Sequence, residues 1–259
     1  MDAQLFVTHA QMEDAHWWFL ARRQILGAVL EACVPPGKGK LLIDIGCGTG
    51  GNAAAFADRY SVIGVEPAEA AVSLARIRFP QIDFVSGAAP EDVLAEARLA
   101  DVFVLSDVLE HIENDGAIIE RLLAVAKDGA LFLATVPANQ ELWTEHDVSH
   151  GHFRRYSLES FAALWRDVPV STRLLSYFNS RLYPVVYGLR RLHQWRNNQA
   201  AHNATDLALP LAPVNRALRM VFAGEAKHIV KHIGRGTSAY SRGVSIIGLF
   251  QKESLSSHA

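Results

Sequence analysis

The spacing of apolar residues changes along the chain from a helical period to the short runs typical of buried strands. Residues 11–33 place Trp18, Ile25 and Val29 at helical spacing, and Pro35-Pro36-Gly37 ends this pattern. Apolar runs rich in β-forming residues follow at 40–45, 61–66, 82–86, 101–106 and 130–136, separated by helical patterns at about 51–59, 68–78, 91–97 and 115–126. This alternation predicts a parallel, doubly wound α/β sheet with ligands at the carboxyl ends of its strands.

The alternation changes after residue 137. A polar loop at 139–156 leads to a helical pattern at about 157–166 and a strand pattern at 170–177, and a last apolar strand appears at 244–250. About 65 residues separate these two strands, far more than a hairpin loop needs. We therefore expect a helical insertion that covers the substrate side of the ligand site at the carboxyl ends of the strands. The predicted units are an N-terminal helical lid at 1–36, a core at 37–178 plus 244–252, and the insertion at 179–243.

Composition favours one large α/β domain with an elaboration, since the 259 residues are 50% hydrophobic and 20% charged. The net charge of −2 hides a division: residues 1–149 carry 10 Lys and Arg against 22 Asp and Glu, whereas residues 150–259 carry 15 against 5. A basic C-terminal half favours an anionic substrate or an anionic membrane surface, with a solvated basic face as the alternative.

Other compositional features bear on the cellular location. The start lacks the basic and apolar regions of a leader peptide, and no apolar run reaches about 18 residues, which predicts a cytoplasmic protein. Contact with the inner face of the membrane is the alternative. Two cysteines, Cys33 and Cys47, provide no disulfide framework.

A glycine-rich turn follows the first predicted strand. Residues 41–45 (LLIDI) run into Gly46-Cys47-Gly48-Thr49-Gly50-Gly51 and then into a helix. Glycines let the backbone turn sharply there and approach a ligand without a Cβ in the way. The spacing also satisfies GxGxxG, so an NAD-dependent oxidoreductase is an alternative. Glu66 ends the second strand, where a carboxylate can accept hydrogen bonds from the two ribose hydroxyls of NAD or of another nucleoside cofactor.

Several segments together resemble the class I S-adenosylmethionine-dependent methyltransferases. Asp44, two residues before the first glycine, completes the DxGxGxG form of their motif I, and residues 106–112 (SDVLEHI) and 136–139 (VPAN) resemble the same core. Residues 16–23 (HWWFLARR) resemble the HWWF-x-x-RR segment of a bacterial branch that includes ubiquinone-type O-methyltransferases. The resemblance implies an α/β, Rossmann-like seven-stranded sheet in the order 3-2-1-4-5-7-6, with an antiparallel hairpin at one edge. It also implies S-adenosylmethionine as the cofactor and S-adenosylhomocysteine as its product.

The resemblance assigns roles in cofactor binding. Asp44 helps position the cationic methionine part, and Arg22 or Arg23 can pair with the methionine carboxylate beneath an aromatic lid helix, although packing alone also explains some of the aromatic residues. The chain reads Gly87-Ala88-Ala89-Pro90 where many family members have an acidic residue, so a backbone carbonyl or a water would contact the adenine amine. The predicted cofactor-binding residues are Trp18, Arg22, Asp44, Gly46, Cys47, Gly48, Gly50, Glu66, Pro67, Ala88, Ser106 and Asp107.

Histidines gather at 111 and in the loop at 139–156, where this fold places substrate chemistry. The predicted catalytic residues are Asp107, His111 and His152. In one interpretation His111 is a general base, because imidazole titrates near neutral pH. In a second, Glu110, His111 and His152, with Asp107, bind a divalent metal in a pattern that resembles small-RNA 2'-O-methyltransferases, although Asp107 replaces their first Glu. In a third, Glu110 and His111 only cap and pack the following helix.

The sequence therefore predicts O-methylation of a hydroxyl on a small or lipid-linked acceptor, such as a glycan precursor or a quinone-like phenol. Residues 177–196 and 213–231 mix aromatic, aliphatic and basic side chains, which suits a lid over an apolar substrate, peripheral contact with an anionic membrane, or packing on the domain or a second subunit. No nucleic-acid-binding module appears, so no nucleic acid partner is expected. The alternatives are an NAD-dependent oxidoreductase and a cofactor-binding scaffold that has lost catalysis.

Overall fold

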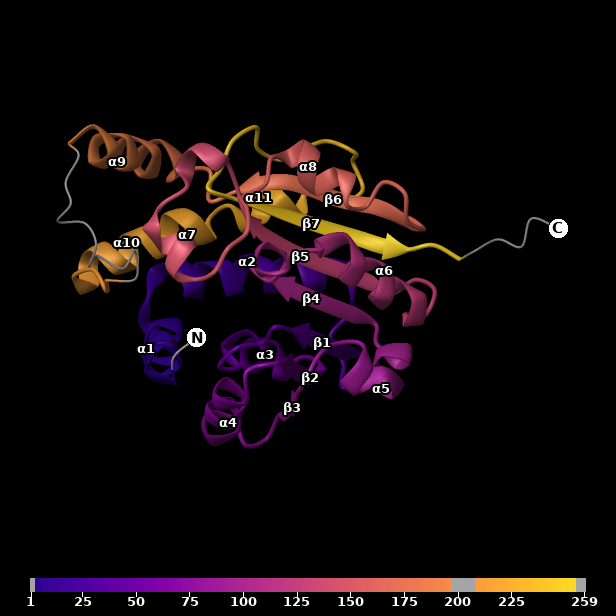
Figure 1. The fold of residues 1–259 in the computed structure, drawn as a ribbon. Coiled ribbons are helices and arrows are strands. Elements are labelled where there is room, and N and C mark those ends of the chain that lie inside the picture. Colours follow the sequence, from indigo (N-terminus) through magenta and orange to yellow (C-terminus); the bar gives the residue numbers. More distant parts are fainter. Residues whose placement is uncertain (1–2, 197–207, 255–259) are drawn as a thin grey trace.

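A seven-stranded sheet forms the centre of the molecule in the computed structural model, which describes residues 3–196 and 208–254 (Figure 1). Its strands are β1 (Leu41–Ile45), β2 (Ser61–Glu66), β3 (Asp83–Ser86), β4 (Val102–Ser106), β5 (Leu131–Pro137), β6 (Val170–Phe178) and β7 (Ser245–Lys252). The order is β3-β2-β1-β4-β5-β7-β6. Strands β1 to β5 are parallel, and β7 is antiparallel to both β5 and β6. This confirms the predicted order and the antiparallel edge.

The central strands are apolar along their whole length because both faces of the sheet are covered. Every residue of β4 and β5 is buried, as expected for parallel strands between two layers of helices. One face packs against α2 (Trp17–Cys33), α3 (Gly51–Ala57) and α4 (Glu69–Arg78), and the other against α5 (Leu94–Leu99), α6 (Asp115–Val125) and α8 (Leu158–Ala163). The alternating side chains of β1 show the division, since Leu42 belongs to the first layer and Ile43 to the second.

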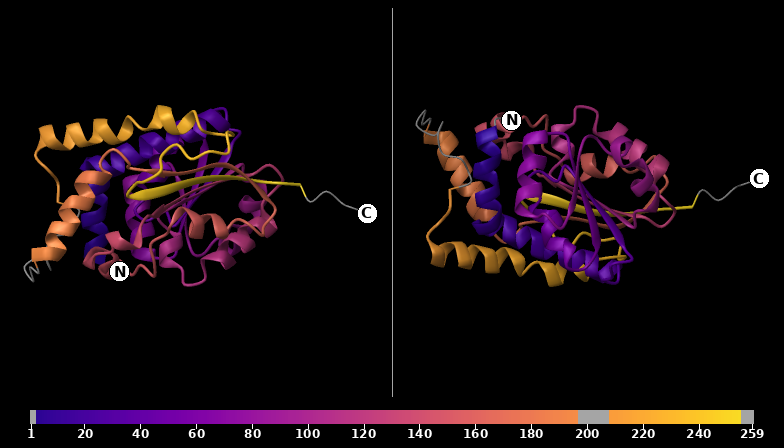
Figure 2. Two further views of the ribbon diagram at one scale, coloured as in Figure 1. Left: turned by 90° about the horizontal axis from the view of Figure 1, so that it is seen from above. Right: turned by 90° about the horizontal axis from the view of Figure 1, so that it is seen from below.

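Two helices from the predicted insertion form a further layer outside α2. Helices α10 (Ala212–Ala223) and α11 (Ala226–Val230) run along α2 in both views of Figure 2. The buried Phe222 contacts Trp17 and Phe178, and Asn215 Nδ2 donates to the carbonyl of Ala15 at 2.8 Å. Helix α9 (Tyr183–Arg196) belongs to the same segment. The division at 179–243 stays a prediction, and its residues 197–207 lie outside the described ranges.

Two segments with uninterrupted amphipathic patterns in the sequence are each divided into two helices in the structure. The N-terminal pattern forms α1 (Ala3–Ala15) and α2, separated by His16 in an extended conformation, whose ring accepts a hydrogen bond from the Trp18 amide at 3.3 Å. The pattern at 213–231 breaks between α10 and α11 at Glu225. This buried carboxylate accepts hydrogen bonds of 2.8 Å from the amides of Ser180 and Arg181.

Short helices complete the connections around the sheet. These are η1 (Glu91–Val93), η2 (Leu109–His111), η3 (Gln140–Leu142) and α7 (Glu145–Ser149). In Figure 1, α1, α7, α9 and α10 gather on the side to which β4 and β5 point, which is the carboxyl edge of the parallel strands. No helix within the two described ranges combines the length and the apolar character needed to cross a bilayer.

Candidate active site

The glycine turn between β1 and α3 forms the floor of the candidate site. Gly46, Gly48 and Gly50 have φ angles of +65°, +54° and +87°, which a side chain would strain. A Cβ placed on Gly48 would meet nothing within 4 Å, so this backbone faces open space and a ligand can approach it closely. The Cys47 side chain instead is buried beneath the turn against Gly64. Cys47 can therefore contact a cofactor only through its backbone.

Glu66 stands at the end of β2 beside this turn. Its Oε2 accepts a hydrogen bond from the Gly48 amide at 3.1 Å, and its Oε1 accepts one from the Ala68 amide at 3.0 Å. The carboxylate is half-buried and each oxygen keeps a further lone pair. Glu66 thus both supports the turn and presents acceptor atoms for a pair of hydroxyls, as the predicted ribose contact requires.

Asp44 is a buried carboxyl at the carboxyl end of β1. Only 1% of its surface is exposed, and its Oδ2 has no hydrogen-bond partner. Burial raises its pKa to about 7, although the charge of Arg22 opposes this change. An unpaired buried carboxyl beside an open glycine turn fits a ligand that brings a positive charge, as the methionine part of S-adenosylmethionine does.

Arg22 and Asp107, both predicted to bind the cofactor, pair with each other. The Arg22 guanidinium donates to Asp107 Oδ2 and lies 4.3 Å from the centre of the Trp18 ring. Arg22 Nε is buried without a partner, so this N–H remains available to a ligand carboxylate. Asp107 has a φ of +57°, uncommon outside glycine, and Thr135 Oγ1 approaches its other oxygen at 3.3 Å. The pair joins α2 to the loop after β4, beside the glycine turn.

The remaining predicted cofactor residues follow the neighbouring strands. Pro67 follows β2, Ala88 follows β3, and Ser106 ends β4, so all three lie at the same edge of the sheet. The Ala88 amide donates to Asp92 Oδ2 at 2.7 Å, and Ser106 Oγ lies 3.2 Å from Thr135 Oγ1. The structure therefore gathers at one edge the residues that the sequence placed in the cofactor site. Their contacts with a cofactor stay predictions.

A buried carboxylate on α1 supports the glycine turn, a role that the sequence alone did not predict. Glu13 Oε2 accepts hydrogen bonds of 2.8 Å from Thr49 Oγ1 in the glycine turn and from Arg78 Nη1 on α4. Arg78 also bonds Asp14 Oδ2 at 2.8 Å and the Thr49 carbonyl at 2.7 Å. A Cβ on Gly51 would collide with Glu13 and Arg23, which explains this glycine by the close approach of α1 and α2. No spacing pattern could reveal the contact, because Glu13 and Arg78 are 65 residues apart.

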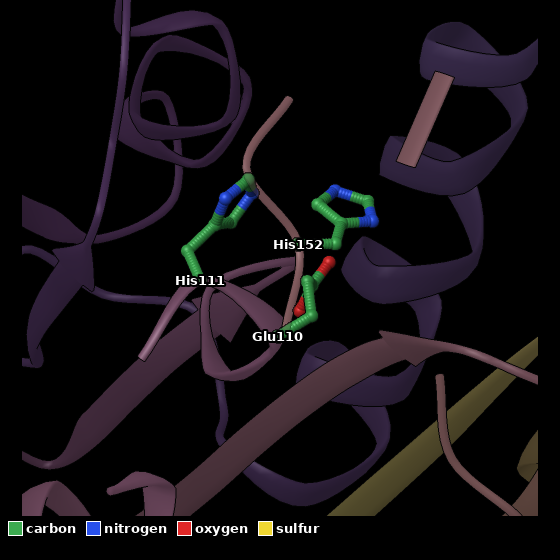
Figure 3. A group of neighbouring side chains, drawn as sticks. All are labelled: Glu110, His111 and His152. Atoms are coloured by element: carbon green, nitrogen blue, oxygen red, sulfur yellow. The ribbon is translucent and has the colours of Figure 1, made fainter. Parts of the chain in front are cut away.

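Glu110, His111 and His152 form a cluster at the same edge (Figure 3). One donor atom from each lies within 4.8 Å of the others, and the two rings meet edge to face with centres 4.6 Å apart. Burial lowers the pKa of His111 to about 4, helped by the nearby His152 and His150. Burial also raises the pKa of Glu110 to about 8. His111 is therefore neutral at pH 7 and can accept a proton or bind a cation.

A second carboxylate holds His152 in place. Asp147 is fully buried, and its Oδ1 lies 2.9 Å from His152 Nδ1. Asp147 also accepts hydrogen bonds from Arg155 Nε at 2.9 Å and from Arg155 Nη2 at 3.0 Å. Burial alone would raise the pKa of Asp147, but the hydrogen bonds from His152 and Arg155 hold it well below its usual range. From the sequence, Asp147 and Arg155 belong to the histidine-rich loop at 139–156, but their contacts could not be predicted. The structure shows that they orient His152.

The capping interpretation of Glu110 finds no support in the local contacts. Helix α6 is capped by Asn114, whose Oδ1 accepts from the Ala117 amide at 3.2 Å. Glu110 is 1% exposed, and neither of its carboxylate oxygens has a hydrogen-bond partner. Glu110 and His111 instead lie in η2, directly after the strained Asp107.

Comparisons with known proteins agree with this arrangement. The family model described as a methyltransferase domain matches residues 17–168. A probable S-adenosylmethionine-dependent methyltransferase of Mycolicibacterium smegmatis is 28% identical over 127 residues, covering 49% of this chain and 48% of that protein. A ubiquinone biosynthesis O-methyltransferase of Idiomarina loihiensis is 33% identical over 113 residues, covering 40% and 46%. Both alignments thus span just under half of the relative.

Solved structures share the fold. A phosphoethanolamine N-methyltransferase 2 of Haemonchus contortus in complex with S-adenosyl-L-methionine superposes with a TM-score of 0.52 at 16% identity, covering 89% of this chain and 52% of that one. The antiparallel β7 also separates this sheet from the 3-2-1-4-5-6 order of dinucleotide-binding domains. On these grounds, the chain belongs to the methyltransferase-domain family, among the class I S-adenosylmethionine-dependent methyltransferases.

Proposed function

We propose that this chain transfers the methyl group of S-adenosylmethionine to a hydroxyl of a small or lipid-linked acceptor. The observation that carries the proposal is the position of the Glu110, His111 and His152 cluster at the sheet edge that also holds Asp44, Glu66 and the glycine turn. Bound there, S-adenosylmethionine supplies a methyl group activated by its positively charged sulfur. An acceptor oxygen loses its proton as it bonds to the methyl carbon, and the electrons of the broken carbon–sulfur bond remain on sulfur.

The protein's own contribution is to orient both reactants and to handle that proton. Asp44 and Glu66 supply acceptors for the cationic and ribose parts of the cofactor, and Arg22 offers a buried N–H to its carboxylate. His111, neutral at pH 7, lies where it can assist removal of the hydroxyl proton, and Asp147 orients His152 through its Nδ1. A scaffold that only binds the cofactor has no use for this second cluster.

Replacing His111 tests the proposal. His111→Ala should lower turnover about 10²- to 10⁴-fold while leaving the affinity for S-adenosylhomocysteine unchanged, because the residue handles the acceptor proton and not the cofactor. Turnover is measured with labelled cofactor and a lipid extract of the native cell, and affinity by calorimetry. His228→Ala is the matched control, because His228 on α11 and His232 just after it also meet edge to face at 4.6 Å but lie outside the site. Normal turnover of His111→Ala would refute the proposed role.

The surface beyond the cluster supports an aromatic or amphiphilic acceptor. A cleft of about 450 Å³ lies where α9 leaves the sheet, and its lining includes Tyr183, Tyr187, Tyr240 and Arg242. The Tyr183 hydroxyl reaches Glu141 in η3 at 3.1 Å, which places the cleft beside the exit from β5. Aromatic walls with an arginine suit a ring or apolar chain that carries negative charge.

Helix α10 supports contact with an anionic membrane. Its exposed face carries Val214, Met220 and Val221, which are 49%, 66% and 39% exposed, and the preceding Leu211 is 79% exposed. Exposed basic side chains lie nearby on α10, on α11 and directly after α11: Arg216, Lys227 and Lys231. An apolar stripe flanked by positive charge binds best to bilayers with anionic headgroups.

Vesicle sedimentation tests this contact. The chain should co-sediment with vesicles that contain phosphatidylglycerol and much less with neutral phosphatidylcholine vesicles, because both the stripe and the charges contribute. Met220→Glu should abolish the association. Ile77→Glu is the control, since Ile77 is 77% exposed on α4, away from α10. Equal binding of the two variants would exclude α10 as the contact.

A further inference from the structure

Glu110 is a buried acidic side chain at the active-site edge whose carboxyl oxygens have no hydrogen-bond partner. Only 1% of the residue is exposed. The two closest arginines serve other carboxylates, since Arg22 pairs with Asp107 and Arg155 pairs with Asp147. Buried carboxylates are normally paired or bound to a metal, because an isolated one is costly to take out of water.

The two histidines beside Glu110 provide nitrogen donors from different segments. His111 comes from η2 after β4, whereas His152 follows α7, and Figure 3 shows both rings gathered around the Glu110 carboxylate. The candidate donor atoms of the three residues lie within 4.8 Å of one another. Ligand atoms about 2.0 to 2.2 Å from one tetrahedral cation lie about 3.3 to 3.6 Å apart, so the three side chains need only a small inward movement to share one cation.

The surroundings of His152 match those of a metal ligand. Its Nδ1 lies 2.9 Å from Asp147 Oδ1, so the ring can bind a cation only through Nε2. Asp147 is itself fixed by Arg155 and by the Thr144 amide at 2.8 Å. A carboxylate that fixes the orientation of a histidine ring through its other nitrogen is the usual support for a metal-binding imidazole.

From these observations we propose that Glu110, His111 and His152 bind a divalent transition-metal cation. Two imidazole nitrogens and one carboxylate favour zinc, manganese, cobalt or iron over magnesium and calcium, which prefer sets of oxygen ligands. Three protein ligands also leave coordination positions open for a substrate.

The role of the cation in catalysis rests on the proposed function, whereas its binding does not. The cation holds the oxygen of the acceptor hydroxyl and lowers the pKa of that hydroxyl, so that its proton passes to solvent water. The oxygen then forms a bond to the methyl carbon as the carbon–sulfur bond breaks and its electron pair goes to sulfur. His111 and His152 act in this scheme as ligands and not as the base.

Metal titration of the full chain, without cofactor or acceptor, tests the site. Protein stripped with a chelator is titrated with Zn²⁺ by calorimetry and with Co²⁺ by visible absorption. We expect one Zn²⁺ per chain, cobalt absorption bands typical of nitrogen and oxygen ligands, and no comparable binding of Mg²⁺. His152→Ala should lower the Zn²⁺ affinity at least 100-fold, and Asp147→Asn, which weakens the support of His152 without removing a ligand, about 10- to 100-fold.

Matched variants separate this site from other histidines. His228→Ala removes the exposed member of the His228 and His232 pair and should leave the Zn²⁺ affinity unchanged. Affinity for S-adenosylhomocysteine, measured on the same samples, reports folding and the proposed function independently of the metal. The inference is overturned if the unmutated chain binds no Zn²⁺, or if His152→Ala and His228→Ala bind it equally. Loss of S-adenosylhomocysteine binding with intact Zn²⁺ binding would instead refute the proposed function.

Discussion

At the scale of single residues, Asp44 couples cofactor binding to pH. Its pKa is raised to about 7 by burial, and only the ionised form attracts a cationic ligand. The affinity for S-adenosylhomocysteine should therefore fall as the pH drops below 7. Well below pH 7, where Asp44 is protonated in the free protein, the fall should be about tenfold per pH unit. Calorimetry between pH 6 and pH 8 measures this dependence.

The variant Asp44→Asn isolates this effect from ionisation of the ligand itself. Its affinity should be weaker by about 1.5 to 3 kcal/mol at pH 8, the usual contribution of a charged hydrogen-bond partner, and should lack the part of the pH dependence that Asp44 causes. The free energy of unfolding of the ligand-free variant should not decrease at pH 8, because burying the ionised carboxylate opposes folding above its usual pKa. Identical pH profiles for the unmutated chain and the Asp44→Asn variant would show that ionisation of Asp44 does not control the affinity for S-adenosylhomocysteine.

Asp147 has the opposite linkage to pH. Its pKa is held well below the usual value by His152 and Arg155, so the ionised carboxylate stabilises the fold above pH 4, and the contribution is lost as the pH falls through the lowered folded-state pKa. Asp147→Asn should lower the free energy of unfolding by about 3 to 5 kcal/mol at pH 7, as expected for a broken buried ion pair. Urea denaturation at pH 7 and pH 3 should show the difference shrinking in acid. A pH-independent difference would indicate that packing alone matters.

At the scale of secondary-structure elements, Glu13 fastens α1 over the glycine turn. Glu13→Gln weakens the charged contact with Arg78, so the amides of residues 3–15 should exchange with solvent about 10- to 100-fold faster, as expected when a charged hydrogen bond is lost. Hydrogen exchange read by mass spectrometry measures this. Glu31→Gln is the control, because it removes only an exposed pair with Arg59, which contributes little. Equal exchange in both variants would show that α1 is held by its apolar contacts.

The elements that the sequence predicted well are those with local causes. The strands at 61–66 and 101–106 agree with β2 and β4 to within one residue, because period and burial determine them. The glycine turn was also identified correctly, since its φ angles demand glycine. The break at His16 and the role of Glu13 were missed, because both depend on contacts between distant segments. Asp147 was seen without its role, which arises only when α7 brings it to His152 and Arg155.

At the scale of the whole molecule, the segment between β6 and β7 shares its packing with the N-terminal helices. Phe222 on α10 is fully buried against Trp17 and Phe178. Phe222→Ala should therefore lower the free energy of unfolding of the entire domain by about 3 to 5 kcal/mol. Tryptophan fluorescence and circular dichroism in urea should report one coincident transition.

Met220 provides the matched control on the same helix. It is 66% exposed, so Met220→Ala should change the free energy of unfolding by less than about 0.5 kcal/mol. Separate transitions for the two probes would show that the predicted insertion unfolds on its own. In that case, deletion of residues 181–240 would leave a folded core, whereas a single transition predicts that the deletion exposes the apolar surface of α2.

The place of β7 in the sheet has a consequence for synthesis on the ribosome. Among the described strands β6 pairs only with β7, and β7 is translated after β5 and β6. At ~5–20 residues per second, residues 179–244 take about 3 to 13 s to translate. For that time the nascent chain presents the open edge of β5 and an unpaired β6, both rich in apolar residues. Such edges invite pairing with other chains, so we expect newly made molecules to depend on chaperone protection until β7 emerges.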